Sequence, residues 1–251
     1  MLKRLIAYPL LILLLFAFYK YGRNLWYPFY LRLAGKKTVS QVMEMYEKPV
    51  EVALSPLFAA KGLSYPPKKM ALFVMKEERV LELWASDNEK DFFKVTEYPI
   101  LASSGKLGPK LKEGDRQVPE GIYKIIGFNP NSAFHISMKL NYPNPFDLTM
   151  SRKEGRKNPG SDIFIHGNSV STGCLAMGDD AIEELFTLSY KTGKSNIEVI
   201  IFPADPRKGP LVPTVASPAW TGELYKKIEK KFRSITNIKS SSKATGRGRS
   251  L

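Results

Sequence analysis

The chain has 251 residues, of which 43% are hydrophobic and 12% aromatic, with a net charge of +14 and one cysteine. This length and this content of core-forming residues suit one folded domain with appendages, and they exclude a chain that is disordered throughout. The single cysteine excludes an intramolecular disulfide.

The positive charge is concentrated at the two ends. Residues 1–37 hold seven basic residues and no acidic one, and residues 226–251 hold nine basic residues and one acidic one, whereas 38–225 hold 22 basic and 23 acidic residues. A nucleic-acid-binding domain carries its basic face on the folded part. The near-neutral middle of this chain therefore argues against nucleic acid as a partner.

The N-terminal segment has the pattern of an export signal. Lys3 and Arg4 precede an apolar run over 5–18, the order that a secretory signal has, and aromatic residues alternate with basic ones over 23–32, as at a membrane interface. We expect residues 1–23 to be a signal or anchor segment. It would place the protein in the periplasm, or at the periplasmic face of the inner membrane through residues 5–19. Cleavage and retention both stay open, and the alternative is a buried N-terminal helix.

Residues 24–69 are expected to form a helical linker region. Val39, Val42, Met43 and Tyr46 have the spacing of one face of a helix. Pro49 predicts the end of that helix, because proline interrupts the backbone hydrogen bonds. A second helix is expected over 51–60.

From residue 70 onward the pattern changes to short strands. Apolar or alternating runs bounded by turn residues predict them over 70–76, 80–85, 93–101, 122–128, 134–140, 162–166 and 196–202. One helix is expected among them, capped by Asp179 or Asp180. The sequence thus predicts a mainly β domain over 70–203. A Pro-rich linker, a short helix over 219–233 and a basic, partly disordered tail are expected over 204–251.

The residues best suited to chemistry lie between positions 165 and 177. Cys174 follows Gly173 shortly before the predicted helix, where backbone N–H groups could lower the pKa of a thiol or bind an oxyanion. His166, one of two histidines in the chain, lies upstream at the end of a strand. A thiol with an ordinary pKa of about 8.5 needs such a base near neutral pH. The residues alone leave open the alternative of a buried, inert cysteine and a core histidine.

This stretch resembles the active-site signature of the L,D-transpeptidase (YkuD-like) family, which is His-Gly, a spacer and Ser-x-Gly-Cys. The matching residues are His166, Gly167, Ser171, Thr172, Gly173 and Cys174. Gly114, Asp115 and the run 119–123 resemble that family's Asp…Thr-Pro-x-Gly strand start. The runs 134–147 and 173–177 resemble its YafK/DpaA-type branch of murein enzymes. The resemblance covers about residues 70–203.

The resemblance implies a β-sandwich or open barrel with a helix behind the active-site loop. It implies that Cys174 attacks the carbonyl at the L-centre of diaminopimelate in a peptidoglycan stem peptide and forms a thioester. His166 would accept and return the proton, with the Gly167 carbonyl orienting its ring. The backbone N–H groups of Gly173 and Cys174 would form the oxyanion hole.

Further residues are candidates for substrate binding, each with a structural alternative as a strand, turn or loop residue. They are His135, Tyr142, Asn144, Arg152, Arg156, Ser171 and Thr172. Arg152 and Arg156 are considered because arginine binds carboxylates bidentately.

Two departures from the family pattern bear on the reaction. Thr172 and Ala176 stand where many members have His and Arg, and the spacer before Cys174 is short. These features favour water as the acceptor, which gives an L,D-carboxypeptidase or an amidase that detaches a wall-linked lipoprotein. An amine acceptor would give cross-linking or lipoprotein attachment.

No cofactor is expected. Two histidines and one cysteine show no zinc-ligand spacing, and no phosphate-binding glycine loop is present in the sequence. Two rival interpretations remain. One is a non-catalytic, membrane-tethered wall-binding module, and the other is a structural envelope protein whose cysteine pairs between chains.

Overall fold

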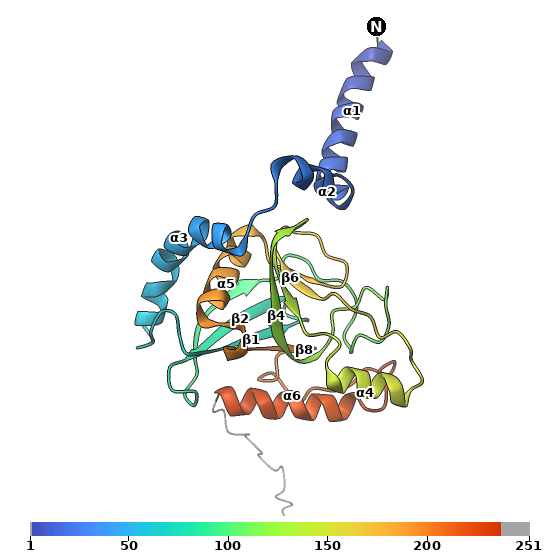
Figure 1. Ribbon diagram of the computed structural model, residues 1–251. Coiled ribbons are helices and arrows are strands. Elements are labelled where there is room, and N and C mark those ends of the chain that lie inside the picture. The colour runs from blue at the N-terminus through green and yellow to red at the C-terminus, as the bar shows by residue number, and fades with distance from the viewer. Residues whose placement is uncertain (1, 237–251) are drawn as a thin grey trace, which may run out of the picture.

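The computed structural model describes residues 2–236. Position 1 and residues 237–251, which hold most of the predicted basic tail, lie outside the described residues. The helices are α1 (Leu2–Tyr21), α2 (Arg23–Ala34), α3 (Val39–Ala59), α4 (Pro145–Lys153), α5 (Asp179–Thr192) and α6 (Thr221–Thr236), with a 3₁₀ turn, η1, at Lys194–Asn196. The strands are β1 (Lys69–Met75), β2 (Val80–Ser86), β3 (Phe93–Pro99), β4 (Gly121–Ser132), β5 (His135–Leu140), β6 (Phe164–His166), β7 (Leu175–Ala176) and β8 (Ile197–Phe202) (Figure 1).

The eight strands form one mixed sheet in the order β3-β2-β1-β8-β4-β5-β6-β7. Neighbours are antiparallel except for the parallel pairs β1–β8 and β6–β7. The long strand β4 pairs with β8 over 121–124 and with β5 from Ile125 onward. The sheet is therefore continuous through β4, and this mixed sheet with helices agrees with the predicted mainly β domain. The predicted strands are present, and α4 and β7 are additions to them.

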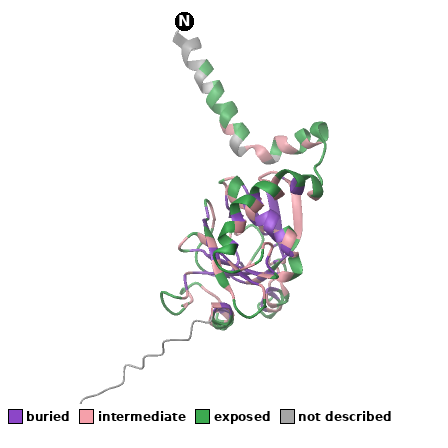
Figure 2. Ribbon diagram, turned by 90° about the vertical axis from the view of Figure 1, so that its left-hand side faces the viewer, coloured by how far each residue is buried: buried purple, intermediate pink, exposed green. Residues whose placement is uncertain are grey.

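Helices lie on both sides of this sheet (Figure 1), and many residues of the strands are buried (Figure 2). One core lies under α3 and α5 and includes Leu54, Phe58 and Phe186. The other lies under α6 and includes Phe73 and Phe232, whose rings are 5.2 Å apart. Burial of one large apolar side chain contributes about 1.5–3 kcal/mol. The segment beyond residue 203 is thus part of the folded domain as far as the end of α6.

A buried polar cluster fixes α6 to the loop before β4. The Lys76 ammonium donates to Glu120 Oε1 at 2.8 Å and to the carbonyls of Gly108 and Val118 at 3.0 Å. The Tyr225 hydroxyl of α6 donates to Glu120 Oε2 at 2.7 Å. A buried charge is tolerated when it is paired and hydrogen-bonded in this way. The cluster joins β1, the 108–120 loop and the C-terminal helix.

The prediction that a helix ends at Pro49 was wrong. Helix α3 continues through Pro49 and Pro56 as one 21-residue element. It begins at a capping box in which Thr38 and Gln41 bond each other's backbone N–H. Its buried side chains lie against the sheet core, and this tertiary packing outweighs the lost backbone hydrogen bonds.

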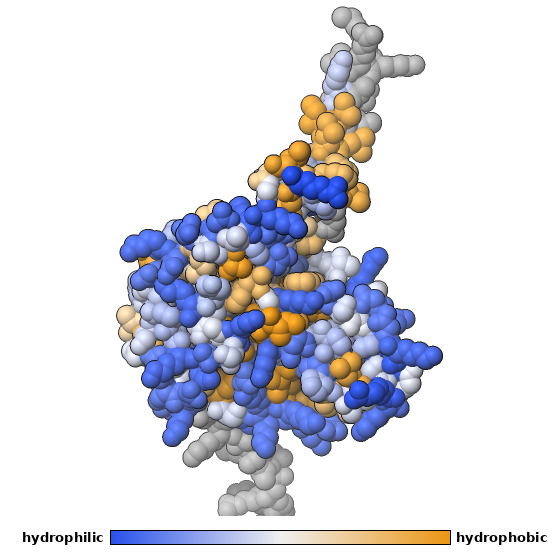
Figure 3. Space-filling view, in the orientation of Figure 1, coloured by the Kyte–Doolittle hydropathy of each residue, from blue (hydrophilic) through white to orange (hydrophobic). Residues whose placement is uncertain are grey.

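The helix α1 leads away from the domain (Figure 1) and exposes apolar side chains over 11–16 (Figure 3). Its C-terminal end meets α2 through the stacked rings of Tyr19 and Trp26, whose centroids are 5.3 Å apart. Among residues 2–236, no helix is both long enough and apolar enough to cross a membrane.

Candidate active site

The strands β6 and β7 bring the histidine and the cysteine together. They pair in parallel, with Ile165 opposite Leu175 and His166 opposite Ala176. Side chains alternate between the two faces of a strand with a period of two. Because Cys174 lies two residues before Ala176, its side chain shares a face with His166. Both side chains line the same cavity.

The loop over 167–174 is shaped by hydrogen bonds to its own side chains and to a distant serine. Ser171 Oγ accepts the Cys174 N–H at 3.0 Å and donates to the Cys174 carbonyl at 2.6 Å. Ser104 Oγ accepts the Gly173 N–H at 2.6 Å and donates to the Arg116 carbonyl at 2.8 Å. Gly173 has a φ of +94°, which glycine adopts without strain. These contacts fix the turn that presents the thiol.

The Gly167 carbonyl sets the orientation of His166. It lies 2.7 Å from His166 Nδ1. Since a carbonyl can only accept, Nδ1 carries the proton and Nε2 is left as the nitrogen that can take one. On the opposite side the ring is covered by Phe134, with centroids 4.9 Å apart. His166 is therefore held in the tautomer that a general base would need.

Burial favours the neutral form of both groups, although Cys174 is only half-buried. It raises the pKa of the Cys174 thiol above its ordinary value, with Asp162 adding to the rise and Lys110 opposing it. Burial also lowers the pKa of His166, although its bond to the Gly167 carbonyl works in the other direction. Desolvation disfavours the charged form of each group. The shifts favour a thiol beside a neutral imidazole, and they run against a lowered thiol pKa, which was one of the two effects considered for the backbone N–H groups.

The cavity in front of Cys174 has a volume of about 380 Å³. Its wall combines hydrogen-bonding side chains with two aromatic rings. The lining residues are Asn129, Asn131, Ser132, Ala133, Phe134, Ser137, Asp162, Phe164, His166, Thr172 and Cys174. Of the residues predicted to bind substrate, Thr172 is in this wall.

The β4–β5 hairpin forms one side of the cavity and is tied to the N-terminal segment. Asn131 donates from Nδ2 to the Lys37 carbonyl and accepts the Lys37 N–H at Oδ1, both at 2.8 Å. Lys37 lies between α2 and α3, 94 residues away in sequence. The connection couples the position of the hairpin to the segment that follows α2.

The two amides predicted to form the oxyanion hole are both engaged here. The Gly173 N–H is bound to Ser104 and the Cys174 N–H to Ser171. In addition, the strand β7 and residues 177–178 separate Cys174 from α5, whose N-cap is Gly178 without a side-chain cap bond. The predicted Asp cap was therefore wrong. Asp179 instead accepts the Asn168 N–H at 2.7 Å and so holds the active-site loop.

His135 lies outside the Cys174 cavity. Its Nε2 is 2.7 Å from Glu183 Oε1 on α5 and 3.5 Å from the Tyr46 hydroxyl on α3. This histidine connects the start of β5 to both helices. The structure therefore gives it a local structural environment rather than a place in the cavity wall.

Tyr142, Asn144, Arg152 and Arg156 are also absent from the residues that line the cavity. Tyr142 is buried and donates to the Pro159 carbonyl at 2.8 Å. Asn144 caps α4. Arg152 contacts Thr149 on the same helix, and Arg156 donates to the carbonyl of Leu111 at 2.5 Å. Each of these side chains has a structural partner.

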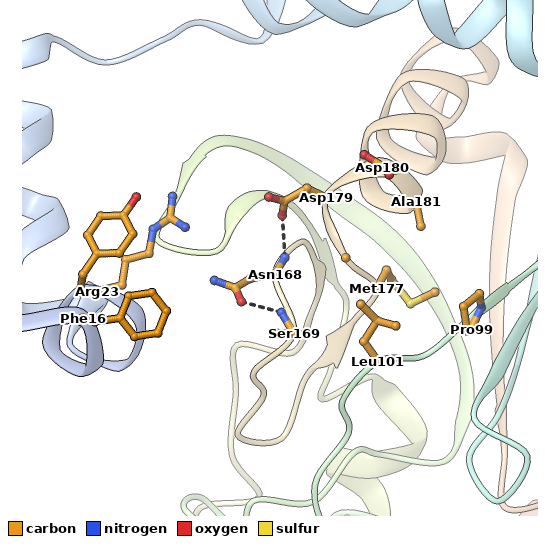
Figure 4. Close-up of a pocket in the computed structure, with 12 residues that line it drawn as sticks. Phe16, Arg23, Pro99, Leu101, Asn168, Ser169, Met177, Asp179, Asp180 and Ala181 are labelled. Atoms are coloured by element: carbon orange, nitrogen blue, oxygen red, sulfur yellow. Dashed lines mark hydrogen bonds between the residues drawn. The ribbon is translucent and has the colours of Figure 1, made fainter. Parts of the chain in front are cut away.

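A larger cavity, of about 690 Å³, lies on the other side of the active-site loop (Figure 4). It is bounded by Asn168 and Ser169, by Asp179 at the start of α5, and by Phe16 and Arg23 of the N-terminal helices. Neither Cys174 nor His166 lines it. The chemistry is therefore assigned to the smaller cavity. Among residues 2–236, no cluster of three or more metal-ligating side chains is present.

The comparison with known proteins agrees with this geometry. Residues 69–201 match the L,D-transpeptidase catalytic domain, and the chain belongs to that family. It is 34% identical over 135 residues to YafK of Escherichia coli K12, which is provisionally named an L,D-transpeptidase. That match covers 52% of this chain and 52% of YafK, so the aligned region spans about half the length of the curated relative.

Two solved structures are more distant. Pgp2 of Campylobacter jejuni, a helical cell shape determining protein, is 20% identical with a TM-score of 0.45, over 55% of this chain and 48% of Pgp2. Bd1075 of Bdellovibrio bacteriovorus is 24% identical with a TM-score of 0.40, over 68% and 58% of the two chains. The assignment to the family rests on the match to its catalytic domain.

Proposed function

We propose that the protein is a cysteine acyl-transfer enzyme that acts at diaminopimelate in peptidoglycan stem peptides. The observation that carries the proposal is the arrangement of Cys174 and His166 on one cavity wall, with His166 Nδ1 bound to the Gly167 carbonyl. This is the pairing that thiol nucleophiles use. The membership of the chain in the L,D-transpeptidase family supplies the substrate class.

In the first step, His166 Nε2 takes the proton of the Cys174 thiol while Sγ attacks the carbonyl carbon at the L-centre of diaminopimelate. The bond from that carbon to the nitrogen of the next residue breaks, and the leaving nitrogen takes the proton from His166. A thioester remains on Cys174. An oxyanion is a stronger acceptor than a hydroxyl, so the developing negative charge takes the Cys174 N–H from Ser171.

We propose water as the acceptor in the second step. His166 takes a proton from water, the hydroxyl oxygen adds to the thioester, and the C–S bond breaks to release the carboxylic acid and the thiol. Two features support water: Thr172 in the cavity wall and the fully buried Ala176 stand where many family members carry His and Arg. The product is a shortened stem peptide or a stem released from an attached lipoprotein.

The test is mass spectrometry of defined muropeptides after incubation with the protein, beside a Cys174→Ala control. Cysteine-dependent loss of the terminal D-alanine or of a lipoprotein remnant supports hydrolysis. A cysteine-dependent dimer contradicts water as the acceptor and supports transpeptidation. If no species changes and a carbapenem leaves Cys174 unmodified, the enzyme proposal fails in favour of a wall-binding module.

We also propose that the protein is exported and works at the periplasmic face of the inner membrane, or in the periplasm if its N-terminal segment is cleaved. The basic start followed by an apolar run over 5–18 supports export. The exposed apolar side chains of α1 over 11–16 would then contact lipid. Protease accessibility in spheroplasts tests this, because only an exported domain is digested without lysis.

A further inference from the structure

An ion pair lies at the edge of the Cys174 cavity. Lys139 of β5 is opposite Phe164 of β6, and its ammonium lies 2.5 Å from Asp162 Oδ1 and 5.7 Å from the centre of the Phe164 ring. The carbonyl of Asp162 lies 3.7 Å from Cys174 Sγ. Asp162 and Phe164 both line the cavity. The backbone of Asp162 therefore lies beside the nucleophile, and its carboxylate and the Lys139 ammonium form an exposed pair at the edge of the cavity.

The stability of the fold does not account for this pair. The side chains of Lys139 and Asp162 are 39% and 63% exposed, and ion pairs at that exposure contribute only about 0–1 kcal/mol. Asp162 also has a φ of +55°, a region that few residues other than glycine adopt. Two charges that remain accessible can bind a ligand without the cost of desolvating a buried group.

Asp162 also differs from the other residues of the cavity wall in its formal charge. Asp162 carries the only Asp, Glu, Lys or Arg side chain among the eleven residues that line the cavity. Its bond to Lys139 lowers the pKa of the Asp162 carboxyl, so that this group is ionised at neutral pH. The other polar lining residues are amides, hydroxyls and the neutral His166, which suit a peptide backbone. A charged group of the substrate therefore has one place to bind.

We propose that Asp162 and Lys139 recognise the zwitterionic D-centre of diaminopimelate. This inference rests on the proposed function and names how the same site selects its substrate. The D-centre carries an ammonium, which would bind Asp162, and a carboxylate, which would bind Lys139. The D-centre carbon lies roughly 6 Å along the side chain from the carbonyl that Cys174 attacks. The proposal thus requires the ion pair to lie about that far from the carbonyl that Cys174 attacks.

The charges of the substrate make the inference testable. We would measure kcat and KM on three stem tetrapeptides, which carry diaminopimelate, diaminopimelate amidated at the D-centre, or lysine. The lysine peptide keeps the ammonium and lacks the carboxylate, and the amidated peptide has a neutral carboxamide in its place. Lys139→Met and Asp162→Asn are compared with Lys124→Met, which removes an exposed strand lysine outside the cavity wall.

We expect the wild-type protein to prefer free diaminopimelate over the other two peptides by about tenfold in kcat/KM. Lys139→Met removes that preference through KM, so that the three peptides are processed with similar kcat/KM. Asp162→Asn raises KM for all three peptides, which share the ammonium. Its kcat does not fall, since loss of a negative charge beside Cys174 favours the thiolate. Lys124→Met behaves as wild type.

Two outcomes separate this inference from the proposed function. If the wild-type protein processes stem peptides and Lys139→Met keeps its preference for free diaminopimelate, the ion pair does not read the D-centre, and the proposed function stands. If the wild-type protein processes none of the three peptides, the proposed function fails and the inference fails with it. A loss of preference accompanied by a lower melting temperature than that of Lys124→Met would indicate a structural role and would overturn the inference.

Discussion

Gly167 has no space for a side chain. A Cβ at this position would lie 2.6 Å from Asp179 Oδ1, 2.9 Å from His135 Cβ and 3.0 Å from Ile182 Cγ2. Its φ lies outside the left-handed region, so space alone excludes alanine. The same residue holds His166 through its carbonyl. Any shift that relieves the clash therefore moves the catalytic base.

We expect Gly167→Ala to lower the free energy of unfolding by about 1–3 kcal/mol, the usual cost of one extra group in a packed site. Cysteine-dependent turnover should fall about 10²-fold, because a misplacement of about 1 Å in a catalytic group has that effect. The two quantities are measured by urea denaturation and by release of product from a stem tetrapeptide. The fall should appear in kcat more than in KM, since the substrate cavity is lined by other residues.

The matched control is Gly127→Ala. A Cβ there meets only Lys139 Cβ at 3.7 Å, an ordinary contact, and the φ of Gly127 is also outside the left-handed region. This variant should unfold within about 1 kcal/mol of wild type and retain full turnover. If Gly167→Ala matched the control in both measurements, the reasoning from space at position 167 would be refuted.

Three other predictions concern buried polar groups. The rate at which iodoacetamide modifies Cys174 should be low at neutral pH and should rise with pH. Its midpoint should lie above the value of about 8.5 for a free thiol, because burial raises the pKa of Cys174. A midpoint below that value would contradict this. Glu120→Gln should lower the free energy of unfolding by about 3–5 kcal/mol, since it leaves Lys76 buried without its carboxylate. Tyr225→Phe removes only a neutral donor and should cost about 1 kcal/mol. Equal losses for the two variants in urea titrations would refute this ranking. Burial raises the pKa of Asp147 to about 6, above its ordinary value of about 3.9, so the folded state binds the extra proton and this group adds stability as pH falls from about 7 to 4. Asp147→Asn should remove roughly 3 kcal/mol of that pH dependence. Parallel curves of unfolding free energy against pH for variant and wild type would contradict the raised pKa of Asp147.

The strands of this fold could be predicted because they are short apolar or alternating runs bounded by turn residues, and the central ones are buried almost throughout. The strand β7 could not, since its two residues hold their conformation through pairing with β6 and with Ala102 rather than through any pattern of their own. The continuity of α3 through Pro49 could not be predicted either. The buried face of α3 packs against the sheet, and helix propensities of neighbouring residues give no information about that tertiary contact.

The local part of the site could be predicted, and its distant part could not. Cys174, His166 and Gly167 lie within nine residues, and one motif specifies them. Phe134 begins the run 134–140 that was predicted to be a strand. The irregular pairing of β4 with β5 instead places it in the hairpin turn, with its ring over His166. The partnership of Ser104 with Gly173 spans 69 residues and carries no sequence signal.

The resting state of the site follows from burial more than from the motif. Burial disfavours a pre-formed thiolate and imidazolium, because it moves both pKa values toward the neutral forms. A neutral imidazole with its proton fixed on Nδ1 is already a competent base, so no prior ionisation is required. The thiol loses its proton when a carbonyl carbon is within reach of Sγ, because the new bond and the backbone N–H groups then stabilise the charge. Under the proposed function, the placement of the substrate would therefore govern reactivity, and the free thiol would stay weakly nucleophilic until a substrate enters.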